Sequence, residues 1–127
     1  MISDRVGDFI IRLQNAARIG KRGLSVPYSA HLLAIAKKLR ELGFLEKISS
    51  EDTKTFSVAL AYDERGPRLR GVKRLSKPGR RMYSPHTKAH TVKGGTGARI
   101  ISSPKGIVSD SEARKSKVGG EELFEIW

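Results

Sequence analysis

Residues 98–117 read ARIISSPKGIVSDSEARKSK, and this stretch decides how the C-terminal half of the chain folds. Its apolar segments, 98–102 and 106–108, predict two strands joined by a polar turn. Ser109 and Glu112 have the spacing of a capping box, so we expect a short helix to open there and to run through Lys117. The order strand, turn, strand, helix follows from this one stretch.

The rest of the C-terminal half is predicted to be mostly β. We expect a strand with one strongly basic face at 69–76, a turn at Pro78-Gly79 and a brief strand at 80–83. Residues 123–127 predict a closing strand whose aromatic end packs on the core. Residues 84–97 are expected to form a basic, glycine-containing connection with at most one loose helical turn, because periodicity is poor there.

Two helices are predicted in the N-terminal half. Apolar residues at helical intervals indicate the first over 3–19, with Ser3 as its N-cap. The second is capped by Ser29 or a residue near it and ends at Gly43, a residue type that commonly follows a helix C-terminus. Three cations on this second helix are expected to face solvent: Lys37, Lys38 and Arg40.

Three strands complete the N-terminal half. Residues 24–26 form a short strand, and residues 44–48 and 56–62 form a hairpin. The resulting order, α-β-α-β-β, ends at the turn-forming cluster 63–67. We therefore expect an α+β fold made of two small packed units, divided after residue 64, of which the second is mostly β with one short helix.

Positive charge is concentrated in the second expected unit. The 127 residues include 25 Lys and Arg against 13 Asp and Glu, which gives a net charge of +12. Residues 1–64 carry ten basic and eight acidic side chains, whereas residues 65–127 carry fifteen and five. Within 65–109 there are twelve Lys and Arg and no Asp or Glu. This distribution indicates an anionic polymer as partner; a merely solvated basic face is the alternative.

Composition excludes several other classes. The absence of cysteine rules out a disulfide framework and thiolate metal sites. The longest apolar run, 32–36, is far shorter than the roughly 18 residues needed to span a bilayer. Charges at Asp4, Arg5 and Asp8 are unlike a secretory leader. We therefore expect a cytoplasmic protein without membrane contact.

The sequence shows no catalytic or metal-binding apparatus. His86 and His90 have an i, i+4 spacing but no third ligand near them. The glycine-rich residues 94–97 resemble a phosphate-binding loop, yet they precede an expected strand instead of opening a helix. No clustered acids and no nucleophile with its base are visible. We therefore expect neither enzymatic activity nor a cofactor or metal.

The polar turn 102–106 is the candidate recognition element. The hydroxyls of Ser102 and Ser103, the backbone amides and Lys105 can contact phosphates, ribose 2′-OH groups and base edges when a rigid turn presents them. Tyr83 lies in a basic setting beside Arg81 and offers a plane on which a base can stack. The alternatives are that the turn is an ordinary connection and that Tyr83 belongs to the core.

Several motifs run in fixed order through nearly the whole chain. The most specific is GARIISSPKGIV at 97–108, and the others are Asp4, Asp8, Arg12, Asn15, Pro27, Ser29, Gly43-Phe44, Lys77-Pro78-Gly79, Arg81, Tyr83, Asp110, Ala113-Arg114, Gly119-Gly120-Glu121 and Trp127. Together they resemble the bacterial-type family of small-subunit ribosomal protein eight. The resemblance implies a structural, ribosome-bound protein that is a primary binder of the central domain of small-subunit ribosomal RNA and organises its assembly.

The resemblance also implies further partners. Neighbouring small-subunit ribosomal proteins are expected to contact the chain. Many members of the family repress translation by binding a look-alike site on messenger RNA, so the chain's own messenger RNA is a further expected partner.

Part of the site follows from matching the family's motifs position by position. The family's turn reads Ser-Thr-Ser-any-Gly, so Ser102 and Gly106 match, Ser103 keeps the hydroxyl of Thr, and Pro104 replaces the second Ser and loses an N–H. Gly119-Gly120-Glu121 matches the family's Gly-Gly-Glu, whose acid braces the turn or meets a base edge. The remaining RNA-binding candidates are Lys105, Tyr83, Arg81, Ser29, and, as phosphate contacts, Lys73 and Arg74.

Two other classes of protein stay as alternatives. A sequence-indifferent binder of polyanions or acidic membranes would use residues 65–109 as a charged surface and would bind heparin, DNA and RNA with similar affinity. A basic enzyme acting on nucleic acid would need clustered acids, metal ligands or a nucleophile with its base, all of which the sequence lacks.

Overall fold

The structure is a computed structural model that describes residues 4–50, 53–84 and 97–127. The chain divides into two compact units: the N-terminal unit, Asp8–Arg70, and the C-terminal unit, Gly71–Trp127 together with Met1–Gly7. The division falls after residue 70, whereas the sequence places the expected boundary after residue 64.

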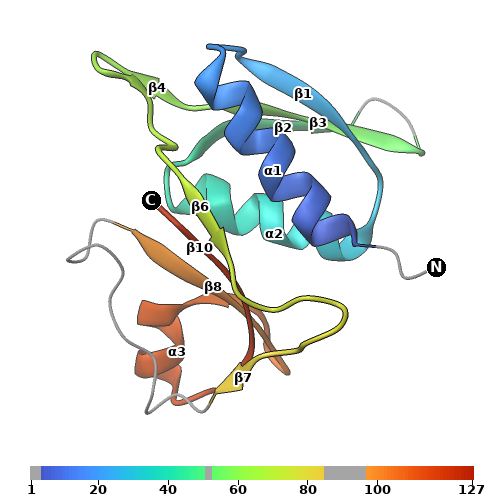
Figure 1. Cartoon of the computed structure of the whole chain (residues 1–127), viewed down its shortest axis with the longest axis vertical. Helices are drawn as coiled ribbons and strands as arrows, with labels where there is room; N and C mark the ends of the chain where they lie inside the picture. Colours follow the sequence, from blue (N-terminus) through green and yellow to red (C-terminus); the bar gives the residue numbers. More distant parts are fainter. Residues whose placement is uncertain (1–3, 51–52, 85–96) are drawn as a thin grey trace. The chain divides into compact units, whose positions relative to one another are not determined.

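Helices and strands alternate in the first half of the chain, and strands dominate the second (Figure 1). The helices are α1 (Arg5–Arg18), α2 (Ala30–Glu41) and α3 (Asp110–Ser116). The strands are β1 (Gly23–Pro27), β2 (Leu45–Ser50), β3 (Thr55–Leu60), β4 (Tyr62–Asp63), β5 (Gly66–Pro67), β6 (Val72–Arg74), β7 (Tyr83–Ser84), β8 (Ala98–Ser103), β9 (Gly106–Ser109) and β10 (Gly120–Ile126). The expected α+β class is confirmed.

The N-terminal unit contains an antiparallel sheet in the order β1-β3-β2. Alternate residues of β3, namely Phe56, Val58 and Leu60, are buried because successive side chains of a strand point to opposite faces. The residues between them are less buried, so this sheet has one core face and one open face. The helices bury an apolar stripe in the same unit: Phe9, Ile10, Leu13, Leu32, Ile35 and Leu39.

Local signals place both ends of α2 where the sequence predicts them. Ser29 is the N-cap and accepts a hydrogen bond from the amide of Leu32 at 3.4 Å. Gly43 follows the helix with φ +91°, a conformation that residues with a Cβ rarely adopt. The expectation that Lys38 faces solvent is wrong: it is 8 % exposed and its ammonium pairs with Glu41 at 2.8 Å.

Two strands are shorter than predicted. The strand expected over 56–62 stops at Leu60, and the next residues turn into the small β4–β5 hairpin. The strand expected over 69–76 is reduced to β6, because the amides of Leu75 and Ser76 both donate to the Leu123 carbonyl, at 3.1 and 3.3 Å, and leave the regular ladder. Alternating hydrophobicity identified these strands but not their ends.

The C-terminal unit contains a sheet in the order β6-β10-β8-β9, with β7 paired to the first residues of β10 (Figure 1). Strand β10 starts at Gly120 instead of the expected Leu123, since Gly120 and Glu121 pair with β7. The predicted capping box is confirmed: Ser109 and Glu112 exchange side-chain and backbone hydrogen bonds at the start of α3. Ile100, Phe124 and Ile126 are completely buried and form the centre of this core.

The first turn of α1 belongs to the C-terminal unit. Its expected N-cap, Ser3, lies outside the described residues. Asp4 caps the helix in the structure, since its Oδ1 accepts a hydrogen bond from the amide of Gly7 at 3.2 Å. No helix within the described parts of the chain has the length and apolar character required to cross a membrane.

Candidate RNA-binding surface

The polar turn at 102–106 is a tight hairpin between β8 and β9. Ser103 and Gly106 are paired across it, so Pro104 and Lys105 form the exposed tip. Proline at the first tip position suits its fixed φ of about −65°, and a glycine after the tip is typical of such a turn. Gly106 has φ +112° and therefore needs to be a glycine. The replacement of Ser by Pro104 thus fits the backbone geometry of the turn.

The Ser103 hydroxyl stiffens this hairpin from within. It donates to the carbonyl of Gly106 at 2.8 Å and accepts from the amide of Lys105 at 3.2 Å. Its proton is therefore committed inside the turn, and an RNA group can only donate to its remaining lone pair. Ser102, by contrast, is half-buried and makes no side-chain hydrogen bond to any described residue.

Three of the predicted site residues lie in one row across the sheet. Tyr83 in β7 is opposite Glu121 in β10, and Glu121 is opposite Ser102 in β8. Residues directly opposite each other on antiparallel strands share one face. Tyr83 is 70 % exposed, which excludes the alternative that it is a core residue. The row places an exposed ring and a hydroxyl on either side of a carboxylate.

Gly120 permits the close approach of β10 to the turn. A Cβ at this position would lie 2.2 Å from the carbonyl oxygen of Ser102 and 3.0 Å from the Cα of Ser103. Both atoms belong to the backbone, so they could move aside only by shifting the end of β8. Gly119 lies between α3 and β10. Of the predicted Gly-Gly pair, Gly120 therefore borders the β8–β9 hairpin.

Glu121 holds the basic loop, residues 75–82, that leads from β6 to Tyr83. Its Oε2 accepts hydrogen bonds from the hydroxyl of Ser76 and from Nη1 of Arg81, the latter at 3.2 Å. Ser76 is 4 % exposed and its Oγ also accepts from the amide of Met82 at 3.2 Å. Sequence reasoning missed Ser76, because its partner Glu121 is 45 residues away and no local pattern connects them.

Several arginines of the acid-free segment are neutralised by acids from other parts of the chain. Arg74 forms a two-pronged ion pair with Asp4. Arg99 is buried and pairs with Glu122 and Glu125 on the neighbouring strand. These arginines hold the C-terminal unit together and contribute less positive potential at its surface than the sequence suggested.

The ion pair with Arg74 changes the pKa of Asp4. Burial raises the pKa of Asp4, but hydrogen bonds from Arg74 and from the Gly7 amide outweigh that effect and hold the pKa below its ordinary value. The predicted phosphate contact Arg74 is thus committed to a carboxylate. Its neighbour Lys73 is exposed on β6 and has no ion pair within the described residues.

Comparison with known proteins identifies the family. The family model for "Ribosomal protein S8" matches residues 4–127. The chain belongs to the ribosomal protein S8 family. Similar proteins named "Small ribosomal subunit protein uS8" come from Rhodopirellula baltica, 38 % identical over 99 % of both chains, and Pelagibacter ubique, 40 % identical over 99 % of this chain and 98 % of the relative. Another from Xylella fastidiosa is 40 % identical over 96 % of both chains.

Membership of the S8 family settles the general class of protein. The chain is a structural protein of the small ribosomal subunit that acts in translation, and it is not an enzyme. Its partners are ribosomal RNA and ribosomal proteins, and it is bound to the ribosome. The resemblance stated from the motifs is therefore confirmed.

Proposed function

We propose that the chain is a primary binder of the central domain of small-subunit ribosomal RNA and that the β8–β9 turn, with Tyr83, reads that RNA and organises its assembly. The observation that carries the proposal is the row Tyr83–Glu121–Ser102, which adjoins a turn stiffened by Ser103. Recognition of an irregular RNA stem needs groups held in fixed positions, because flexible basic side chains contribute attraction but little discrimination.

The chemistry of this surface suits distorted double-stranded RNA. A-form RNA hides most base edges in a deep groove, so proteins read its shallow groove, its 2′-hydroxyls and its unstacked bases. The exposed ring of Tyr83 can stack on such a base and contribute roughly 1–3 kcal/mol. The hydroxyl of Ser102 and the ammonium of Lys105 would contact sugar and phosphate.

Electrostatic attraction would come from exposed cations beside this surface. Lys73 and Lys105 are exposed, and the Arg81 side chain is 49 % exposed although it pairs with Glu121. Each phosphate that such a cation neutralises releases counterions, so binding weakens as salt rises. We expect Lys73→Ala to reduce this salt dependence, whereas Arg74→Ala should act mainly by breaking the pair with Asp4. The Ser29 hydroxyl, occupied as the α2 N-cap, stays a predicted RNA contact of the N-terminal unit.

Stacking by Tyr83 provides the test of this function. Wild type, Tyr83→Leu and Tyr83→Phe would be titrated with a central-domain RNA fragment and with an unrelated folded ribosomal RNA fragment of equal length. Tyr83→Leu should weaken binding to the central-domain fragment about 5- to 150-fold without changing its salt dependence. Tyr83→Phe keeps the ring and should retain most of the affinity.

Two outcomes would contradict the proposed recognition. Equal losses on both RNAs would show that Tyr83 contributes no specificity. If wild type bound both fragments, DNA and heparin equally well, charge attraction would explain all of the binding. The chain would then be the sequence-indifferent polyanion binder.

We extend the proposal to messenger RNA, because a surface that reads the shape of a stem accepts any transcript that repeats this shape. The chain would then repress translation of its own messenger. Competition decides this point: an excess of central-domain fragment should displace the messenger fragment, and simultaneous binding of both RNAs would exclude a shared surface.

A further inference from the structure

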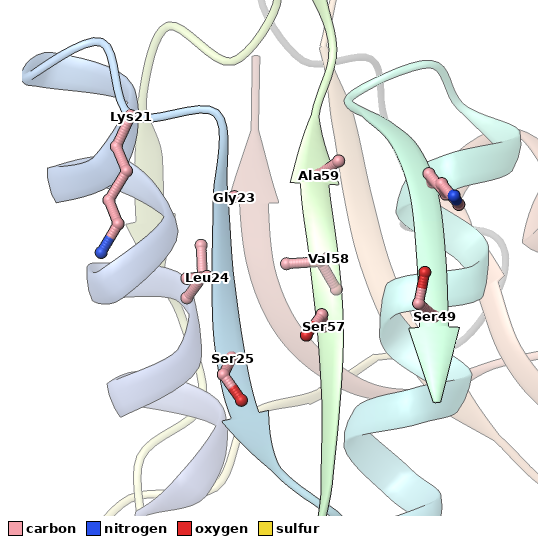
Figure 2. A pocket seen from close by; sticks show the side chains of 9 residues that line it. Lys21, Gly23, Leu24, Ser25, Ser49, Ser57, Val58 and Ala59 are labelled. Carbon is pink, nitrogen blue, oxygen red and sulfur yellow. The ribbon is translucent and has the colours of Figure 1, made fainter. Parts of the chain in front are cut away.

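The open face of the N-terminal sheet carries a row of three hydroxyls. Ser25 in β1 is opposite Ser57 in β3, and Ser57 is opposite Ser49 in β2. Opposite side chains on antiparallel strands are about 5 Å apart at Cβ, so the row crosses the whole width of the sheet. Figure 2 shows the three serines on their neighbouring strands. This face is turned away from the core, since Phe56 and Val58 on either side of Ser57 are buried.

Small residues make the face hollow beside this row. The next row contains Gly23, Ala59 and Lys47. Together these strands line an open hollow of about 480 Å³, with Lys21 beside β1 (Figure 2). Gly23 is held close to β3, because a Cβ there would lie 3.0 Å from the carbonyl oxygen of Val58. Because Gly23 has no side chain and Ala59 has only a methyl group, a chain lying in the hollow could approach the sheet closely.

Two of the hydroxyls and both ammonium groups around the hollow are available to a ligand. Within the described residues, the hydroxyls of Ser25 and Ser49 have no hydrogen-bond partner, and neither Lys21 nor Lys47 forms an ion pair. The acid next to Lys47 is Glu46, the extra residue of a β-bulge, which has no Cα partner in β3 and does not line the hollow. Two ammonium groups thus border a surface of hydroxyl groups.

This chemistry favours a nucleic-acid backbone over a protein partner. Binding energy in protein interfaces is concentrated in buried aromatic and other large side chains, and the residues that line this hollow include no aromatic ring. Interfaces with nucleic acid are more polar and more positive. The absence of a ring also removes the means for base stacking, so contact with sugars and phosphates is favoured.

We propose that the open face formed by Ser25, Ser57 and Ser49, together with Lys21 and Lys47, binds the sugar–phosphate backbone of ribosomal RNA. This inference rests on the proposed RNA-binding function and adds a contact in the N-terminal unit, whereas the recognition turn is in the C-terminal unit. Such a contact raises affinity without reading sequence. It lets one chain hold a second segment of RNA besides the stem read by the turn.

The double variant Lys21→Gln/Lys47→Gln tests the charges of this face. Log K falls as log salt rises, and each lost phosphate contact makes this fall less steep by about 0.7–0.9. Between 50 and 200 mM salt, wild-type binding to the complete central domain should therefore weaken about 7- to 12-fold more than binding of the double variant. The matched control is Lys37→Gln/Arg40→Gln on α2, which removes the same charge from exposed positions outside the hollow. Thermal unfolding should be unchanged in both.

The hydroxyl row is tested separately with Ser25→Ala/Ser49→Ala. This variant should lose about 5- to 150-fold in affinity with an unchanged salt slope, because two neutral hydrogen bonds are removed and no counterion is involved. Backbone cleavage of the RNA by hydroxyl radicals should show one protected segment in wild type that becomes accessible in the lysine variant.

The outcomes separate this inference from the proposed function. Suppose that wild type prefers the central domain. The open face then does not bind RNA if the lysine variant keeps the salt dependence of wild type, or if the α2 control loses as much salt dependence as the lysine variant. If wild type shows no preference among folded RNAs, the proposed recognition by the turn fails, whatever the lysine variant does.

Discussion

Replacing Ser76 with alanine should destabilise the C-terminal unit and loosen its basic loop. The Ser76 hydroxyl donates to the Glu121 carboxylate and accepts from the Met82 amide, and the residue is 4 % exposed. Alanine fits the same space but leaves both partners without this hydrogen bond. Glu121 retains only Arg81 among the described side chains.

The size of the effect follows from these two bonds. A hydrogen bond to a charged group contributes about 1.5–3 kcal/mol, and a buried donor left unsatisfied costs about 1–3 kcal/mol. Part of this cost is recovered, because Glu121 lies near the surface at 18 % side-chain exposure and water can reach it. We therefore expect Ser76→Ala to lower the free energy of unfolding by about 2–3 kcal/mol.

Urea unfolding followed by tryptophan fluorescence measures this loss. Trp127 is the chain's single tryptophan and lies in the C-terminal unit, so it reports on this unit directly. With a slope of about 1.5 kcal/mol per M, the midpoint should fall by about 1–2 M. Ser111→Ala on the exposed side of α3 is the control and should stay within about 0.5 kcal/mol of wild type. A loss no larger than the control's would refute the bracing role of Ser76.

Three further predictions concern the turn and the N-terminus. Gly120→Ala should lower the free energy of unfolding by about 1–3 kcal/mol and weaken RNA binding, because the added methyl group displaces Ser102. Amide chemical shifts of β8 would show this displacement, and unchanged shifts would contradict the steric clash. Ser103→Ala should weaken binding to central-domain RNA by about 1–3 kcal/mol with an unchanged salt slope, whereas Ser103→Thr keeps the hydroxyl and should restore it in the same filter-binding assay. Folding lowers the pKa of Asp4, so the Asp4 carboxylate stabilises the fold at pH values above its ordinary pKa of about 4. This stabilisation is lost as the pH falls through the pKa of Asp4 in the folded chain. Unfolding midpoints between pH 6 and 2.5 should therefore fall less steeply in Asp4→Asn than in wild type, and parallel curves would show that Asp4 is not coupled to folding.

Interactions between residues three or four positions apart made much of the fold predictable. The Ser29 cap of α2, the Ser109–Glu112 capping box and the hairpin tip at Pro104 depend only on neighbouring residues. The start of β10 was missed, because Gly119 and Gly120 read as breakers in sequence whereas Gly120 pairs with β7 in the structure. A glycine's role depends on what lies across from it.

The sequence predicted which residues form the candidate RNA-binding surface, but not the hydrogen bonds between them. The motifs named Tyr83, Glu121 and Ser102, and strand register puts these residues in one row. No pattern in the sequence indicated that Ser76 joins them or that the Ser103 hydroxyl is used inside the turn. These facts depend on contacts between strands that are distant along the chain.

The sequence alone determined the class of fold, the caps and turns, the excess of positive charge and the family, because each of these depends on composition or on residues close together in the chain. Only the tertiary structure decided which cations stay exposed. Residues 65–109 contain no acid, yet Arg74 meets Asp4 from the other end of the chain and Arg99 meets Glu122 on the neighbouring strand. Ion pairs form between groups that are close in space, and the separation of those groups in sequence does not reveal that distance.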